Sequence, residues 1–316
     1  MSALTILPPL RGPHWVAARQ HRTTAKVFTI VVLVSALLVT GLLIALGTDP
    51  KGSVSQGADT GLSMLLHRAI TPLALLPALV GAFVAGPLVA RELETGTYSW
   101  LWTQSVSPAR WLAARLTLAT AVTLTGTTVL VMAFRTARNS LEKGAMIFSW
   151  HDSAYEMLGP VAVAQCALGI GVGTLVGLLV RRTVPAMMVT VLIVFVVQSA
   201  FVLWLRELLW PVQSLVSKTP IDVVNTVGVW DFAEGMLTSD GTRILSETCW
   251  GPEGVGMTFE QCMAGKGGVT YFADVHPPSH FWPIQLVETG ILLVLAGLAV
   301  AVAFRVLGKR HAGSAS

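Results

Sequence analysis

The side chains that could carry out chemistry are few, and their spacing matches no catalytic or metal-binding motif. His276 and His280 lie four residues apart, but the two prolines between them prevent a helix that would turn both rings toward one metal ion. The pair Gly265-Lys266 lacks the upstream glycine and the following serine or threonine of a phosphate-binding loop. Neither HExxH nor GxSxG occurs. We therefore predict no enzymatic activity, no metal site and no cofactor bound by this chain.

Charged side chains gather in one stretch, "ARELETGTYSW" at residues 90–100, which follows a mostly apolar run. Arg91, Glu92 and Glu94 could form charged hydrogen bonds with a partner protein, and such bonds are stronger than neutral ones. Gly96 would allow a bend in the backbone. The stretch is therefore a candidate contact surface for a second polypeptide.

A carboxylate and two amides fall inside long apolar runs. Glu288 and Gln285 lie in the last run, and Gln198 lies in the run before it. A carboxylate inside a bilayer costs several kcal/mol unless it is paired, protonated or hydrated. Two interpretations remain open. These residues line a translocation path, or Glu288 lies one or two turns from the outer boundary and reaches water.

Two of the three cysteines, Cys249 and Cys262, fall in the same polar stretch. If that stretch faces the outside of the cell, the two thiols can be oxidised to a disulfide. The alternative is a pair of unbonded, buried thiols. Cys166 lies within an apolar run, and we expect it to pack there.

The elements that must position these residues are membrane spans. Hydrophobic residues make up 53% of the 316 positions and charged residues only 12%, against about 25% charged in soluble domains. The mean hydropathy is +0.68. The apolar runs are continuous rather than alternating, which favours helices over the strands of a barrel. We predict an all-α, polytopic membrane protein with spans at residues 27–46, 72–90, 111–134, 159–180, 184–205 and 282–306.

The basic residues predict the orientation of these spans. With both termini in the cytoplasm, the inner segments carry twelve basic residues against two acidic ones, Glu92 and Glu94. The outer segments then carry nine basic and fourteen acidic residues. The short, doubly basic loop 181–183 supports the same orientation. The net charge of +4 is spread out, so we expect no binding to nucleic acid.

Three segments complete the predicted single domain of residues 1–316. Residues 1–26 carry basic side chains at helical spacing, which predicts a cytoplasmic interfacial helix, although an ordinary basic flank would look similar. Residues 88–106 predict a separate cytoplasmic helix, because Gly86-Pro87 ends or bends the span before it. Residues 206–281, the longest polar stretch, predict a small extracellular segment between the fifth and sixth spans.

Small residues mark one predicted helix contact. Gly169, Gly173 and Gly177 are four residues apart in the fourth span and share one face. Small residues at this spacing let two helix backbones approach closely in lipid, within one chain or between two protomers. The alternative is that these glycines only reflect the frequency of glycine in membrane helices.

The stretch "VAGPLVARELETGTYSWLWTQSVSPARWLAARL", residues 84–116, resembles the corresponding part of ABC type 2 permeases from actinobacteria. The N-terminal "WVAARQHR" is similar to the segment before their first span. The predicted layout matches over most of the chain, but the resemblance does not extend to the sequence of the external segment.

The resemblance implies the permease subunit of an ABC exporter, embedded in the lipids of the plasma membrane. Such a subunit works as a homodimer or heterodimer with a second permease, and cytosolic ABC ATP-binding subunits hold the ATP and Mg²⁺. The resemblance also implies a main coupling helix at residues 91–104. Its ATPase-coupling residues would be Arg91, Glu92, Glu94, Gly96 and Thr97. The family moves drugs, antibiotics, lipids and polysaccharides, so the resemblance names no single cargo.

Two other functions remain as alternatives. An ion-coupled secondary transporter would use Glu288 as a protonatable site, but the sequence shows no broken helices at matched positions in its two halves. A membrane-embedded enzyme, immunity protein or scaffold would not transport at all.

Overall fold

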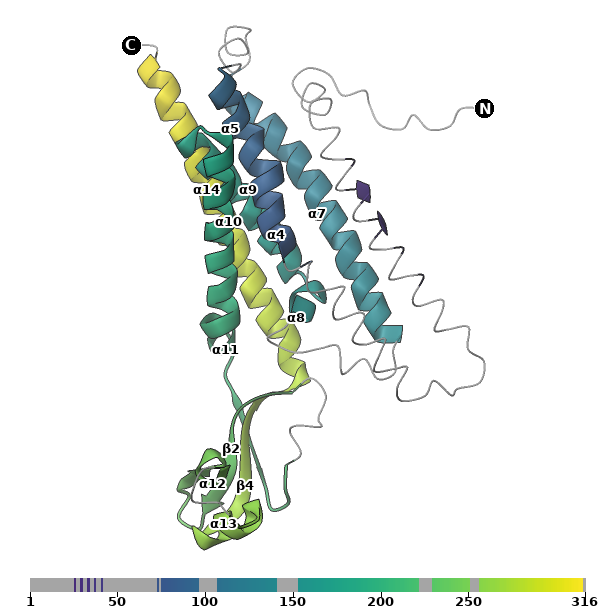
Figure 1. The fold of residues 1–316 in the computed structure, drawn as a ribbon, viewed down its shortest axis with the longest axis vertical. Helices are drawn as coiled ribbons and strands as arrows, with labels where there is room; N and C mark the ends of the chain where they lie inside the picture. Colours follow the sequence, from purple (N-terminus) through teal and green to yellow (C-terminus); the bar gives the residue numbers. More distant parts are fainter. Residues whose placement is uncertain are drawn as a thin grey trace.

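Long helices form a bundle, and a small sheet extends from one end of it (Figure 1). The computed structural model describes residues 75–96, 107–140, 153–221, 229–250 and 256–314, together with single positions nearer the N-terminus. The predicted interfacial helix at 1–26 and the predicted first span at 27–46 lie outside these residues, apart from single positions.

Five helices of the described part are long and apolar enough to cross a membrane, and they correspond to predicted spans two to six. Their ends differ from the predicted ends by a few residues. Twenty residues at about 1.5 Å each cover the roughly 30 Å of hydrocarbon in a bilayer. The candidate spans are Leu76–Thr95, Pro108–Thr136, Val161–Val180, Thr183–Leu208 and Pro278–Lys309.

The second span continues through a proline that we expected to end or bend it. It consists of α4 (Leu76–Leu79), the π-helical segment η2 (Val80–Ala85) and α5 (Gly86–Thr95). Pro87 has no amide hydrogen to donate, and the amide of Gly86 bonds to the carbonyl of Gly81, five residues back. The wider π turn therefore accommodates the proline. Residues 88–95 belong to the second span rather than to a separate helix, and that part of the prediction is wrong. Residues 97–106 lie outside the described residues.

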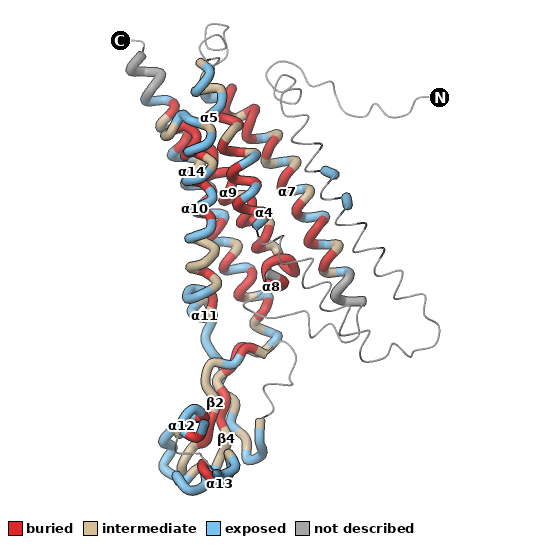
Figure 2. The backbone as a smooth tube through the Cα atoms, in the orientation of Figure 1, coloured by how far each residue is buried: buried red, intermediate tan, exposed pale blue. Residues whose placement is uncertain are grey.

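The fourth span, α9 (Val161–Val180), lies at the centre of the bundle. Its membrane window is 72% buried, whereas the windows of the fifth and sixth spans are 22% buried. Figure 2 shows the same contrast, with α9 mostly buried and α10 and α14 exposing much of their length. The remaining helices of the bundle are α7 (Pro108–Ser140), α8 (Ser153–Met157), α10 (Thr183–Ala200), η4 (Phe201–Leu205), α11 (Arg206–Leu208) and α14 (Phe281–Ser314).

The segment between the fifth and sixth spans contains a four-stranded antiparallel sheet, so the all-α prediction is wrong there. The strand order is β1-β4-β2-β3. The strands are β1 (Gln213–Ser217), β2 (Trp230–Thr238), β3 (Arg243–Leu245) and β4 (Gly268–His276). Two short helices, α12 (Glu247–Trp250) and α13 (Phe259–Gly265), accompany them, and η6 (Pro278–His280) joins β4 to α14.

The sheet was missed because β2 and β4 show no regular alternation of buried and exposed residues. In β4, Ala273 and Val275 pack with Leu215 of β1 in a core of their own, while Phe272 and His276 on the other face are also buried. The register pairs Leu215 with Ala273, which brings the strand after the fifth span beside the strand before the sixth.

Candidate functional site

The first candidate site lies at the end of α5, where the charged stretch of the sequence closes the second span. Glu92 forms a salt bridge with Arg115 of α7 through one carboxylate oxygen. The indole Nε1 of Trp111 donates a hydrogen bond to the other oxygen of Glu92 at 3.1 Å. The side chain of Glu92 is 12% exposed and that of Arg115 is 5% exposed, so solvent screens this pair only weakly. Glu92 therefore ties α5 to α7.

Glu94 makes a second tie, from α5 to the start of α10. Its Oε2 accepts hydrogen bonds from the backbone amide of Thr183 at 2.9 Å and from the Thr183 hydroxyl at 2.6 Å. The first amides of a helix have no partner within the helix, and the positive end of the helix dipole favours a carboxylate beside them. Glu94 thus caps α10 from a different span.

Of the other three predicted coupling residues, the structure describes two. The Arg91 side chain is exposed. Gly96 ends α5 with a φ of 71°, a left-handed conformation that glycine adopts without steric cost. Thr97 lies outside the described residues.

These contacts change the expected role of the two carboxylates. We expected Glu92 and Glu94 to form their charged bonds with a partner protein, but both form bonds within the chain. The helix continues to Thr95, so it carries the two side chains against α7 and α10. A direct contact with a partner stays a prediction for Arg91, Glu92, Glu94, Gly96 and Thr97.

The three glycines of α9 lie against the second span of the same chain. A Cβ added to Gly173 would lie 2.5 Å from the carbonyl oxygen of Gly81 in η2. A Cβ added to Gly177 would lie 3.0 Å from the carbonyl oxygen of Gly86, and one added to Gly169 would lie 2.5 Å from the carbonyl oxygen of Pro77 in α4. The backbones therefore approach as closely as small residues allow. This packing positions α5, with its charged end, on the central helix.

A second candidate site is a charged cluster at the sheet end of the bundle. The guanidinium of Arg206 donates from Nε to Glu288 of α14 at 3.1 Å, and its NH2 lies 3.5 Å from Glu156 of α8. Arg206 also lies over the ring of Tyr155, 4.0 Å from its centre. Arg206 is 1% exposed and Glu288 is fully buried. One cation thus joins three helices together with two carboxylates.

The amides at this end extend the cluster. Gln285 donates to the backbone oxygen of Tyr155 at 2.7 Å and accepts from the amide of Val161 at 3.2 Å. Gln198 of α10 donates to Gln165 of α9 at 3.1 Å, and Gln165 in turn bonds to Glu156. A line of polar side chains therefore crosses the bundle from α10 through α9 and α8 to α14.

The geometry bears on the part of the boundary interpretation that concerns water. Glu288 has no exposed surface and is paired with Arg206, so it does not reach water directly, although it lies about two turns from the start of α14. Gln285 is likewise fully buried and bonded on both sides of its amide. A path through these residues would require their bonds to open, and that role stays a prediction for Gln198, Gln285 and Glu288.

A comparison with protein families matches residues 25–206 to the family described as "ABC-2 membrane transporter related". The matched range covers more than half of the chain and contains the end of α5, its partners on α7 and α10, and the glycine face of α9. This chain belongs to the ABC-2 membrane transporter related family. It is therefore the membrane component of a transporter, from a family that works with an ATP-binding partner. Comparisons with curated proteins and with solved structures gave no match.

The family match ends at Arg206, so the sheet and the last span of this ABC-2 protein lie beyond it. The charged cluster therefore joins residues inside the match, Glu156 and Arg206, to Glu288 outside it. Sequence reasoning missed Glu156 and Arg206 because both were assigned to polar outer segments. The available signal was the position of Arg206 directly after the apolar run that ends at Leu205.

The sheet of this ABC-2 protein contains the predicted disulfide, with Cys249 of α12 bonded to Cys262 of α13. As expected from the prolines, His276 and His280 do not share a helix, but the two rings lie close together. His276 ends the strand, and η6 brings the Nδ1 of His280 to 3.0 Å from the Nδ1 of His276. Within the part of the chain that the structure describes, no group of three or more potential ligands could hold a metal ion.

Proposed function

We propose that this chain is the permease subunit of an ATP-driven ABC exporter. Two permeases, identical or different, would assemble with separate cytosolic ATP-binding subunits that hold ATP and Mg²⁺. The observation that carries the proposal is the end of α5, where two acidic side chains tie one span to two others inside the range of the family match.

The mechanism follows from these ties. Closure of the ATP-binding subunits would push on the polar segment that follows α5, and the exposed Arg91 would contact the partner. The salt bridge from Glu92 to Arg115 would pass the movement to α7, and the cap from Glu94 to Thr183 would pass it to α10. The Glu92–Arg115 salt bridge is mostly buried and therefore little screened by solvent, so it transmits a displacement rather than absorbs it, and the exposed Glu94 cap adds a charged hydrogen bond.

The orientation rests on the charges at the two ends of the bundle. The end that holds the C-terminus of α5 is basic, and within the described residues Glu92 and Glu94 are its only acidic side chains. The sheet end carries most of the acidic residues. An excess of arginine and lysine marks the cytoplasmic side, so we place the coupling end and both termini in the cytoplasm of a plasma-membrane protein. The basic side chains at this end include Arg91, Arg110, Arg181, Arg182 and Arg305.

We infer the class of cargo from the family and from the apolar surface of the helix bundle. We propose a drug, an antibiotic, a lipid or a similar amphipathic molecule. Such molecules partition into the bilayer, where the exposed apolar faces of α10 and α14 lie.

The test is purification of the tagged chain from membranes, followed by assays of ATP hydrolysis and transport in vesicles. We expect an ATP-binding subunit to co-purify. In Glu92→Arg, hydrolysis should continue while transport falls at least tenfold, since the tie to α7 is replaced by repulsion between two cations. Glu247→Arg, in α12, is the control for an exposed charge reversal.

The double variant Glu92→Arg/Arg115→Glu identifies the route of coupling. It restores the salt bridge with its charges exchanged, so transport should recover in part if the tie within the chain carries the movement. Normal transport in Glu92→Arg, or purification of an active transporter without any ATP-binding subunit, would contradict the proposal.

The buried cluster favours a second candidate, an ion-coupled secondary transporter. Two carboxylates around one guanidinium leave one negative charge that a proton could neutralise. Transport that persists without ATP and stops when the proton gradient is collapsed would favour this candidate over the first.

A further inference from the structure

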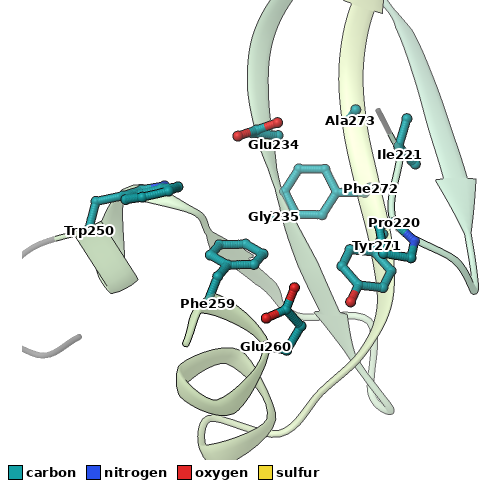
Figure 3. A pocket seen from close by; sticks show the side chains of 10 residues that line it. All are labelled: Pro220, Ile221, Glu234, Gly235, Trp250, Phe259, Glu260, Tyr271, Phe272 and Ala273. Carbon is teal, nitrogen blue, oxygen red and sulfur yellow. The ribbon is translucent and has the colours of Figure 1, made fainter. Parts of the chain in front are cut away.

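The sheet region holds a cavity of about 280 Å³, between the sheet and the two short helices (Figure 3). This volume is at the small end for ligand sites, which start at about 300 Å³. The cavity suits a small molecule or one headgroup of a larger molecule. It lies outside the membrane spans and outside the family match, so neither the coupling end nor the charged cluster accounts for it.

The walls of the cavity are aromatic. Trp250 and Phe259 lie on one side with their rings stacked at 6.0 Å and an angle of 27° between the planes. Tyr271 and Phe272 of β4 line it from the sheet. Figure 3 shows the carboxylate of Glu260 between the rings of Phe259 and Tyr271. Aromatic faces carry a partial negative charge and attract cations.

The charged groups of the cavity are both acidic. Glu234 of β2 and Glu260 of α13 line it, and neither carboxylate has a hydrogen bond or ion pair within the part of the chain that the structure describes. One cation, Arg243, lies 4.8 Å from the centre of the Phe272 ring. Its charge is balanced by Asp274, whose Oδ2 is 2.6 Å away. The cavity therefore offers two uncompensated negative charges.

Covalent and hydrogen bonds hold the wall in place. The disulfide links Cys249, the neighbour of Trp250, to Cys262, in the same short helix as Phe259 and Glu260. At the start of that helix, Thr258 and Gln261 form a capping box in which each side chain bonds to the backbone of the other. The wall is thus fixed in position before any ligand arrives, which reduces the entropy lost on binding.

We propose that this cavity binds a monovalent organic cation, a substituted ammonium group attached to a small apolar body. The two carboxylates would repel an anion. Ca²⁺ and Mg²⁺ need about six oxygen ligands, more than two carboxylates supply, and aromatic faces add none. A substituted ammonium is weakly hydrated, and aromatic faces with nearby carboxylates hold it through its charge and its methyl groups. The proposal does not depend on ATP-driven export.

The test is calorimetry on the full chain in a non-ionic detergent, with benzyltrimethylammonium chloride as the probe. We expect saturable binding that weakens as salt is raised, because part of the attraction is between partly exposed charges. Benzyl alcohol and benzenesulfonate have the same ring without the positive charge, and we expect both to bind at least tenfold more weakly.

Three variants locate the binding. Glu260→Gln should raise the dissociation constant about two- to fivefold, and Glu234→Gln/Glu260→Gln about tenfold. Trp250→Leu should raise it about two- to fivefold by removing a cation–π contact. Glu247→Gln changes an exposed carboxylate on α12 that does not line the cavity, and this variant should bind as the parent chain does.

Each other outcome overturns the proposal. Absence of binding to the parent chain excludes the site, and equal affinity for benzyl alcohol means that the cavity recognises only the apolar ring. Unchanged affinity in the double glutamine variant places the cation elsewhere. Each variant is first checked for an intact Cys249–Cys262 disulfide by mass spectrometry, so that loss of binding is not loss of folding.

Discussion

Arg206 is one of the largest side chains to be fully enclosed in the described part of the protein, and it faces two carboxylates. Placing an ion in a medium of low polarity costs several kcal/mol, and only close opposite charges with good geometry recover that cost. The ring of Tyr155 under the guanidinium adds a favourable contact. The cluster is stable as a set, and its members depend on one another.

Arg206→Met should therefore destabilise the protein strongly. It leaves Glu156 and Glu288 buried without a cation, and breaking such a set costs about 3–5 kcal/mol. The measurement is the midpoint of thermal unfolding in detergent, with tryptophan fluorescence as the probe of unfolding. The matched control is Arg243→Met, because Arg243 is half-exposed in its pair with Asp274 and should cost less than about 1 kcal/mol.

The triple variant Arg206→Met/Glu156→Gln/Glu288→Gln removes all three charges. We expect it to recover much of the lost stability, since no unpaired ion remains. Equal midpoints for Arg206→Met and Arg243→Met would contradict a buried cluster.

His276 gives the sheet region a dependence on pH. Burial among the rings of Trp230 and Phe232 lowers the pKa of His276 below its ordinary 6.5, and the neighbouring His280 lowers it further. In the unfolded chain His276 takes up its proton near pH 6.5, whereas the folded chain binds that proton only at lower pH. Between these two values the unfolded state holds more protons, so stability rises with pH there.

We therefore expect full stability above pH 6.5 and a loss of stability as the pH falls from 6.5 through the lowered pKa. Chemical unfolding at a series of pH values would measure this slope. His276→Phe keeps an aromatic ring beside Trp230 and cannot titrate, so its profile should be flatter. A slope that is the same in both proteins would assign the pH dependence to other groups.

Among the elements, α9 determines how closely the other helices can pack. Gly173→Ala would place a Cβ 2.5 Å from the carbonyl oxygen of Gly81 and 2.9 Å from the Cβ of Ala85. The second span would have to move away, at a cost of about 1–3 kcal/mol. Gly290→Ala in α14 is the matched control, because nothing lies within 4 Å of the added Cβ.

The measurement is again the thermal midpoint, combined with transport in vesicles. We expect Gly173→Ala to lower both and Gly290→Ala to leave both nearly unchanged. If the two variants behaved alike, the close approach of α9 to η2 would not limit the packing.

The spans could be predicted because each is a local property of about 20 successive residues. The sheet could not be predicted in the same way. Its strands are short, fifty residues of chain separate β1 from β4, and their pairing depends on a register that no local pattern fixes. The π segment was also missed, because the sequence shows Pro87 as a break and not the backbone rearrangement that accommodates it.

For the whole molecule, the sequence located the candidate residues but not their partners. The acidic pair of α5 was evident from its contrast with the apolar run, whereas Arg115 and Thr183 lie on two other spans and become its partners only in the assembled bundle. Glu288 was likewise evident, and its partner Arg206 is 82 positions away. Long-range pairing is a property of the packed helices, and no motif records it.

The pairing of β1 with β4 has a mechanical consequence for the helices beneath it. β1 follows α11 and β4 leads through η6 into α14, so two hydrogen-bonded strands brace the outer ends of the fifth and sixth spans. Sliding one span past the other by about 3.4 Å, the rise of one strand residue, would shift β1 against β4 by one position, break the hydrogen bonds between them and turn the side chains to the wrong faces. At this end the two spans must therefore move together as one rigid body. Any sliding of helices during transport has to occur elsewhere in the bundle.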